Sequence, residues 1–356
     1  MQACEIRRNG GPENLVLCER ETPQPGAGEV AIAVAYAGIN FADILARQGL
    51  YPGAPPTPSV VGYEVSGRVS AVGEGVDPAW LGREVLALTN FGGYAQTAVV
   101  GVDYLWPLPP GLALDVAAAI PLNYITAAGL LAMGGLAAGD TLLIHNVGGG
   151  VGLAALELAQ QRGAQVLGTA SGGKHALLRE RGLAEPIDYR REDFVAAVRQ
   201  RTGGTGVDLV LDPIGGAHWK RSLAVLRPSG RLGMYGISGA SAPGLRGKLG
   251  LARLFAQAPW FHPARLIPGN RGVYGINIHA MYEQATLFRR WMAPVLEGVA
   301  AGRLQPRVDR VFALAEAGEA HAYIEARRNV GKVLLRVDPP AAAQSPPAAG
   351  TAPAAT

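Results

Sequence analysis

The hydrophobic positions of this chain follow different patterns on either side of Pro121. Over residues 1–120, short apolar stretches are separated by Gly and Pro turns, which is typical of a β-rich barrel or sandwich. Strands are expected at 29–37, 64–72 and 84–88. The first third of the chain is therefore predicted to be mostly β.

Beyond Pro121, apolar stretches of strand length alternate with longer ones of helical length. Such an alternation predicts a parallel sheet with right-handed crossovers. The expected strands are 141–147, 165–171, 186–189, 207–213, 231–236 and 271–278, with two more near 308–312 and 332–337. The expected helices are 124–138, 151–162, 174–181, 194–202 and 282–301. The pattern as a whole predicts an α/β protein of two domains.

Two segments depart from this regular pattern. Residues 243–270 contain four prolines and are expected to form an irregular lobe, either over a cleft or at a dimer contact. The tail over 339–356 consists of small residues, Pro and Gln, with almost no bulky apolar side chains. A segment of that composition cannot bury a core, so the tail is predicted to be disordered.

Composition and charge exclude several classes of protein. Of 356 residues, 49% are hydrophobic, which suffices for two cores. The net charge of +4 is too diffuse to indicate nucleic-acid binding. Two cysteines, Cys4 and Cys18, exclude a disulfide framework and a cysteine-rich zinc site. Residues 1–8 lack an apolar signal core, and no uninterrupted apolar run approaches the ~18 residues of a membrane span, so a cytoplasmic protein without a span is expected.

The strongest chemical motif is a glycine cluster between the strand at 141–147 and the helix at 151–162. Its sequence is Asn146-Val147-Gly148-Gly149-Gly150-Val151-Gly152, a GGxG form rather than a strict GxGxxG. A pyrophosphate requires bare backbone N–H groups and a helix N-terminus, and glycine permits that close approach. A plain structural turn is the alternative, but the strand–turn–helix context favours dinucleotide binding.

The end of the next strand bears on the choice between NAD and NADP. NAD binders place an acidic residue there, about 20 residues after the glycines. Here Ser171 and Lys174 follow the strand, and no carboxylate is present. A hydroxyl and an ammonium suit a 2′-phosphate, so the sequence favours NADPH over NADH. For Lys174 alone, the alternative is a solvated surface lysine.

Asn40 and Asp43 follow the strand at 29–37 and stand three residues apart, on one face of a helical turn. From spacing alone, capping of a helix by Asn40 explains this pair as well as any chemistry does. Further motifs lie at 37–52, 61–67, 71–76, 123–127, 168–171, 186–189, 212–216 and 329–335. In combination and order, they resemble the medium-chain dehydrogenase/reductase superfamily, in its zinc-free quinone oxidoreductase (zeta-crystallin) type. The chain is most similar to the vesicle amine transport protein-1 subgroup, and the resemblance covers nearly all of residues 1–337.

The resemblance implies a domain layout. It implies a GroES-like catalytic domain over 1–121 and a Rossmann NADPH-binding domain, a doubly wound parallel sheet, over 122–270. Residues 271–338 are expected to add the last Rossmann strand or strands and to return to the catalytic domain. Because this family commonly dimerises by joining Rossmann sheets edge to edge, we expect a homodimer through the edge at 274–278.

The resemblance also implies site residues. Asn40, Asp43 and Tyr51 are expected to line the cleft for nicotinamide and substrate. The residues expected to contact the cofactor are Thr126, Asn146, Gly149, Gly150, Val151, Gly152, Ser171, Lys174, Tyr189, Tyr235 and Asn329. Zinc-dependent relatives carry a Cys where Asn40 stands and a His where Tyr63 stands, so no metal is expected.

These features predict transfer of hydride from NADPH to a small molecule, either a quinone or an α,β-unsaturated carbonyl. Such conjugated acceptors delocalise the charge they gain and depend less on a Lewis acid than an isolated carbonyl does. Tyr51 and Asn40 are the expected donors to the developing enolate oxygen, with Asp43 orienting Asn40 or the backbone. The alternative is a nucleotide-binding regulatory or membrane-associated protein with little turnover.

Overall fold

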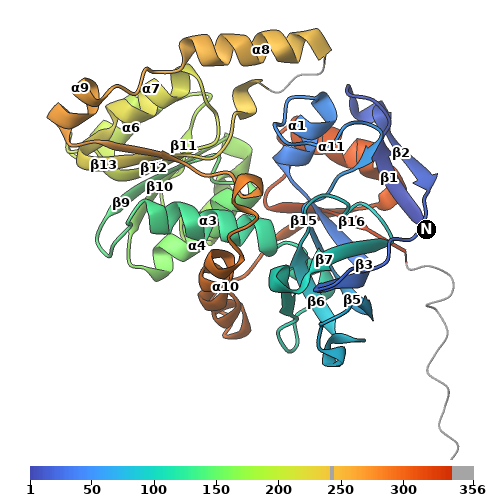
Figure 1. The fold of residues 1–356 in the computed structure, drawn as a ribbon. Coiled ribbons are helices and arrows are strands. Elements are labelled where there is room, and N and C mark those ends of the chain that lie inside the picture. The colour runs from blue at the N-terminus through green and yellow to red at the C-terminus, as the bar shows by residue number, and fades with distance from the viewer. Residues whose placement is uncertain (241–243, 339–356) are drawn as a thin grey trace, which may run out of the picture.

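The computed structural model describes residues 1–240 and 244–338, and it forms two bodies that lie side by side (Figure 1). One body is β-rich and contains both ends of the described chain. The other is a parallel sheet covered by helices. The predicted α/β class, with a β-rich part and a parallel-sheet part, is confirmed. The tail predicted to be disordered, 339–356, lies outside the described residues.

The β-rich body is built on two sheets. A three-stranded sheet has the order β2 (Leu15–Glu19), β1 (Gln2–Ile6), β4 (Ser59–Val60). The seven-stranded sheet has the order β15 (Val308–Ala313), β16 (Lys332–Arg336), β3 (Glu29–Ile39), β5 (Glu64–Val72), β6 (Glu84–Leu88), β8 (Leu105–Pro107), with β7 (Thr97–Gly101) also paired to β3. The two closing strands thus join the strands of the first third of the chain.

The second body contains a six-stranded sheet whose neighbours are all parallel. Its order is β11 (Ile187–Asp188), β10 (Gln165–Ala170), β9 (Thr141–His145), β12 (Val207–Asp212), β13 (Leu226–Met234), β14 (Gly272–Gly275). The order reverses between β9 and β12, and ligands of doubly wound sheets bind outside the carboxyl ends of the strands at such a reversal.

Helices cover both faces of this sheet. The described helices of both bodies are α1 (Phe41–Gln48), α2 (Leu114–Ala117), α3 (Pro121–Met133), α4 (Gly150–Gln161), α5 (His175–Glu180), α6 (Phe194–Arg201), α7 (Ala217–Ala224), α8 (Gly244–Gln257), α9 (Pro263–Leu266), α10 (Ala285–Ala300) and α11 (Ala317–Glu325). On one face α3, α4 and α10 share a core with the inward side chains of β9 and β12. On the other face, residues of α6 pack over β9 and β12.

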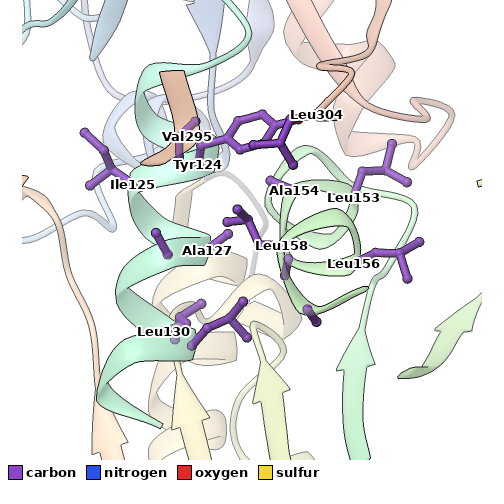
Figure 2. Packing of buried hydrophobic residues seen from close by; sticks show 14 of the residues in the cluster. Tyr124, Ile125, Ala127, Leu130, Leu153, Ala154, Leu156, Leu158, Val295 and Leu304 are labelled. Atoms are coloured by element: carbon purple, nitrogen blue, oxygen red, sulfur yellow. The ribbon is translucent and has the colours of Figure 1, made fainter. Parts of the chain in front are cut away.

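The contact between α3 and α4 shows why these segments are helical and buried. Ala127 and Leu130 of α3 and Leu158 of α4 belong to one buried hydrophobic cluster (Figure 2). Burying one such side chain contributes about 1.5–3 kcal/mol, so this interface anchors the helix that follows the glycine cluster.

One helical stretch, Leu114–Met133, is long and apolar enough to cross a membrane, with a mean hydropathy of 1.7. It is 78% buried inside the fold, however, because it comprises α2 and α3 of the core just described. The burial identifies it as a core segment.

Two predicted segments differ from the structure. The prediction of an irregular lobe over 243–270 is wrong for Gly244–Gln257, which form α8, because the later prolines all follow this stretch. In Figure 1, α8 extends beyond the parallel sheet towards the β-rich body. The strand predicted over 271–278 ends at Gly275, where the Ile276 N–H still donates to the Met234 carbonyl (2.9 Å) before the chain turns away.

Candidate functional site

A cavity of about 1100 Å³ lies at the reversal of strand order and extends to the β-rich body. Its wall includes Asn146 after β9, Ser171 after β10 and Tyr235 after β13. Asn40 and Tyr51 line it from the other body. Ordinary small-molecule pockets measure ~300–1,000 Å³, so this cavity has room for a dinucleotide and a second small molecule.

The glycine cluster forms one wall of this cavity. After β9, Asn146 takes a positive φ of 54°, and α4 begins at Gly150 with Gly149 as its N-cap. A Cβ on Gly152 would lie 2.5 Å from the Asn146 carbonyl oxygen, so only glycine lets the first turn of α4 pack against the loop. The N–H groups of that turn have no partners within the helix and present a positive dipole end, as a phosphate requires.

The cluster is also tied to the opposite body. The Gly331 N–H donates to the Gly148 carbonyl (3.0 Å), just before β16 begins. The Asn329 carboxamide donates to the Gly331 carbonyl (3.0 Å). This bridge holds the 329–332 segment beside the glycine cluster at the start of α4.

A basic end of the cavity lies beside β10. Ser171, Lys174 and Tyr189 line it, as does Arg327. Lys174 Nζ donates to the Asn329 carbonyl (2.5 Å), and burial lowers the pKa of its ammonium group. Glu192, which no sequence motif indicates, also lines this end, and its carboxylate pairs with Arg201 (3.4 Å). The remaining predicted cofactor residues, Thr126, Gly149, Gly150, Val151, Gly152, Tyr235, Asn146 and Asn329, all line the same cavity.

Asn40 is held by a buried ion pair that sequence reasoning did not identify. Its Nδ2 donates to Glu64 Oε1 (2.9 Å), and its Oδ1 accepts from Lys332 Nζ (2.5 Å). Glu64 and Lys332 form an ion pair with exposures of 0% and 2%. The second Glu64 oxygen accepts from the Leu122 N–H (2.7 Å). Both polar ends of the Asn40 amide are therefore engaged, and its orientation is fixed.

Asp43, predicted as a cleft residue, does not line the cavity. Its carboxylate is fully buried and accepts from the Asn40 N–H (2.7 Å) and the Gly62 N–H (3.0 Å). Burial raises the pKa of this carboxyl to about 7, although the two N–H donors and the Lys332 charge act in the opposite direction. The Asp43 carboxylate thus holds the backbone at the start of α1, where Asn40 is the N-cap residue, and the Asn40 side chain contacts Glu64 and Lys332.

The far end of the cavity is aromatic. Tyr51 and Tyr63 lie edge to face with ring centroids 5.9 Å apart, and Phe91 packs on Tyr63 at 4.8 Å. His279 joins them from the other body, 6.0 Å from Tyr51. Tyr51 Oη donates to Asn277 Oδ1 (3.1 Å), and all of these residues except Phe91 line the cavity.

His145, at the end of β9, belongs to a buried hydrogen-bonded network. Its Nδ1 contacts Thr169 Oγ1 (3.0 Å) and its Nε2 contacts Ser222 Oγ (3.2 Å). Ser222 Oγ donates to Asp212 Oδ2 (2.7 Å), which also contacts His218 Nδ1 (2.6 Å). The network links β9, β10 and β12 to α7, and burial lowers the pKa of His145 to about 3.

Two places among the described residues bear on zinc binding. The positions at which zinc-dependent relatives carry Cys and His hold a carboxamide, Asn40, and a phenol, Tyr63, and the Lys332 ammonium already lies against Asn40. Within 1–240 and 244–338, His145, Asp212 and His218 form the one group with metal-binding spacing, and the network above already engages both His145 nitrogens, Asp212 Oδ2 and His218 Nδ1. Neither place fits zinc.

Comparisons with known proteins agree with this architecture. Residues 26–110 match the alcohol dehydrogenase GroES-like domain family, and residues 181–335 match a family described as zinc-binding dehydrogenase. The synaptic vesicle membrane protein VAT-1 homolog of Danio rerio is 35% identical over 333 residues, which is 93% of this chain and 69% of that protein. A quinone oxidoreductase of Pseudomonas aeruginosa is 34% identical over 329 residues, 92% of this chain and 96% of that protein.

Two solved structures are similar throughout. Escherichia coli quinone oxidoreductase complexed with NADPH superposes with a TM-score of 0.84 at 28% identity, covering 94% of this chain and 100% of the other. The CurK enoyl reductase superposes with a TM-score of 0.81 at 28% identity, covering 95% and 99%.

Proposed function

The chain belongs to the medium-chain dehydrogenase/reductase superfamily, on the branch of the quinone oxidoreductases and VAT-1 homologs, and we propose that it is a zinc-independent, NADPH-dependent reductase. The family predicted from the sequence is thereby confirmed. The proposed acceptor is a quinone or an α,β-unsaturated carbonyl. The observation that carries the proposal is the single cavity that joins the phosphate-type turn at Gly149–Gly152 to Asn40 and Tyr51.

NADPH fits the residues of this cavity better than NADH. Lys174 and Arg327 bring two cations to the end beside β10, and Ser171 supplies a hydroxyl. Glu192 is the acidic residue there, and its carboxylate is already bound by Arg201 and by the Asp188 N–H (3.0 Å). A 2′-phosphate suits such a set of donors. The NADPH complex of the similar Escherichia coli enzyme supports the same choice.

When bound, NADPH supplies the hydride. The chain contributes position: the turn at Gly149–Gly152 binds the diphosphate, and the body carrying Asn40 and Tyr51 closes the opposite wall. Most of the catalytic effect is then expected from holding the two reactants together. In place of a metal, the buried Glu64–Lys332 pair fixes Asn40 beside the reacting groups.

This proposal is tested by following cofactor absorbance with a panel of quinones and enones, using NADPH and NADH in parallel. The expected result is acceptor-dependent oxidation with a higher kcat/KM for NADPH. Oxidation must persist after dialysis against a chelator, with metal analysis of the same sample. Absence of oxidation with every acceptor, or its loss on chelation, contradicts the proposal.

A second candidate function has one observation in its favour. Residues 246–271 carry five Lys or Arg and no Asp or Glu. The same segment presents large apolar side chains that are more than half exposed: Leu249, Phe255, Trp260 and Ile267. Cations interspersed with exposed Trp, Phe and Leu suit an anionic membrane surface. Membrane attachment by a protein with little turnover is therefore the alternative.

Sedimentation with lipid vesicles separates the two. Binding to vesicles with anionic lipid but not to neutral ones, without acceptor-dependent NADPH oxidation, would favour the alternative. Turnover without vesicle binding would favour a cytoplasmic reductase.

We further propose a homodimer through β14. This strand is the last in its sheet, so its outer edge has no strand partner within the described residues. An unpaired edge is a template for a second copy. Sedimentation at micromolar concentration is expected to give twice the 37.0 kDa chain mass, and a 37.0 kDa species would contradict the proposal.

A further inference from the structure

Two buried polar atoms at the aromatic end of the cavity have no hydrogen-bond partner within the described residues. They are Tyr63 Oη and His279 Nδ1. Leaving a buried donor or acceptor unpaired destabilises the fold. Both residues line the cavity, so a ligand there is the simplest partner for both.

The two residues reach this place from different bodies. Tyr63 precedes β5 and is 4% exposed, and His279 lies in a single 3-10 turn, His279–Met281, after β14. Their ring centroids are 6.3 Å apart. The pair therefore forms only where the two bodies meet, which is also where an acceptor has to sit between cofactor and β-rich body.

The surrounding backbone holds both rings in place. Phe91 packs on Tyr63 at 4.8 Å and on His279 at 5.2 Å, and it does so with a φ of 71°. A bulky side chain in the left-handed region is strained, and strain of this kind persists where the neighbours require it. On the other side of the imidazole, Gly53 leaves space for Nε2, because a Cβ there would lie 2.6 Å from it.

The donors expected from the sequence are already occupied. Tyr51 Oη donates its proton to Asn277 Oδ1 (3.1 Å). Asn40 Nδ2 donates to Glu64, with its second hydrogen towards the Gly38 carbonyl (3.4 Å). Among the described buried side-chain atoms at this end, Tyr63 Oη and His279 Nδ1 are the ones without a hydrogen-bond partner.

Their protonation states suit donation to a neutral oxygen. Burial raises the pKa of the Tyr63 hydroxyl far above neutrality, so the phenol keeps its proton. Burial also lowers the pKa of His279, so the imidazole is neutral and carries one N–H whose position its partner selects.

We propose that Tyr63 Oη and His279 Nδ1 together form the binding site for the acceptor's carbonyl oxygen. The inference rests on the proposed reductase function and names the residues that recognise its substrate class. In the reaction, the acceptor carbon conjugated to this carbonyl gains the hydride, the oxygen gains negative charge, and water supplies the proton that completes the product as NADPH becomes NADP⁺. Two donors aimed at that oxygen stabilise the charge as it develops.

Substitution of each donor tests the site. Tyr63→Phe is expected to lower kcat/KM at least ~10-fold, towards the ~10²–10³-fold loss in kcat that follows removal of one oxyanion donor. His279→Asn keeps an N–H near the Nδ1 position, whereas His279→Gln moves it towards the Nε2 position. Because the proposed donor is Nδ1, the His279→Asn variant is expected to retain a higher kcat/KM than the His279→Gln variant.

Matched controls lie outside the cavity. Tyr323→Phe removes a hydroxyl that donates to Asp309 (3.0 Å), and because neither residue lines the cavity, it is expected to leave kcat/KM unchanged. The Kd for NADPH, measured by fluorescence titration, is expected to be unchanged in all variants. These controls separate a lost oxygen contact from lost folding or cofactor binding.

A readout without turnover makes the test independent of the reaction. 4-Hydroxybenzaldehyde, whose absorbance shifts to the red when its carbonyl accepts hydrogen bonds, is added to the protein with NADP⁺. The red shift is expected in the wild type and is expected to be reduced in Tyr63→Phe. Equal spectra and equal kcat/KM in the wild type, Tyr63→Phe and His279→Gln overturn the proposal.

Failure of the proposed reductase function gives a different result from failure of the oxygen-binding site. If the wild-type protein fails to oxidise NADPH with every acceptor tested, the reductase proposal is refuted. The aldehyde spectra then test the oxygen-binding site by themselves. A red shift that depends on Tyr63 supports the site, and the absence of a shift overturns it.

Discussion

Lys332 shows how a single buried side chain organises the cleft. Its ammonium group lies between Glu64 and Asn40, with almost no exposure to water. A buried ion pair adds little net stability, but removing one partner leaves the other charge unpaired, at a cost of about 3–5 kcal/mol. The pair is therefore important for geometry more than for stability.

Lys332→Met is accordingly expected to lower the free energy of unfolding by about 3–5 kcal/mol, measured by urea denaturation. Adding Glu64→Gln removes the uncompensated carboxylate and is expected to recover part of that loss. Lys220→Met, on the exposed face of α7, serves as the control with no expected change. A Lys332→Met protein as stable as the wild type would contradict the buried-pair account.

His145 makes a prediction about pH. In the folded protein, burial lowers its pKa from 6.5 to about 3. Between these values the unfolded chain binds a proton that the folded chain does not, so stability is present above pH 6.5 and is lost as the pH falls towards 3. His145→Asn is expected to flatten this dependence. Urea denaturation at several pH values in that interval measures it, and equal slopes for both proteins would count against the account.

The residues predicted to contact the cofactor lie together in the fold, and their contact with NADPH stays a prediction. Every residue selected for the cofactor lines one cavity, because strand ends at a parallel sheet's reversal lie together. Asn40 was selected as a free donor, yet its partner Lys332 lies 292 residues away along the chain. Local sequence gave no sign of that contact, and the unpartnered atoms of Tyr63 and His279 likewise appear only when the two bodies meet.

At the scale of the element, the first turn of α4 depends on a glycine that no other residue replaces. A Cβ on Gly152 would meet backbone atoms of Asn146 and Val147 at 2.5 and 2.7 Å. Backbone cannot yield as a flexible side chain does, so the loop or the helix has to move.

Gly152→Ala is therefore expected to raise the Kd for NADPH more than ~10-fold and to cost about 1–3 kcal/mol of stability from overpacking. Gly101→Ala is the matched control, because Gly101 lies in β7 outside the cavity and a Cβ there would meet its nearest atom, in Tyr104, at an ordinary 3.5 Å. Fluorescence titration and thermal unfolding measure the two effects. If both variants bind NADPH alike, the glycine cluster is not the diphosphate site.

The strongly periodic elements were predictable and the context-dependent ones were not. The strands at β9, β10 and β12 and the helix α4 follow from their apolar runs and the glycines between them. Helix α8 was missed because the prolines around it dominated the local pattern. Strand β14 was predicted too long, since an apolar run does not show where pairing with β13 ends.

At the scale of the whole molecule, the site exists only where two bodies meet. β15 and β16 come from the end of the described chain yet pair beside β3, and the Gly331–Gly148 hydrogen bond joins them to the glycine cluster. Periodicity alone does not indicate that return; the resemblance to a known family did. The acceptor itself is not encoded in any motif, because the fold leaves substrate choice to the side chains at the cleft.

The measurement that tests the central claim most directly is the fate of a labelled hydride. The protein is incubated with an enone that supports oxidation and with NADPH deuterated at the transferred position of C4, and the product is examined by mass spectrometry. The account predicts one deuterium in the saturated product, on the carbon β to the carbonyl. An unlabelled product, or consumption of NADPH with no reduced acceptor, would contradict it.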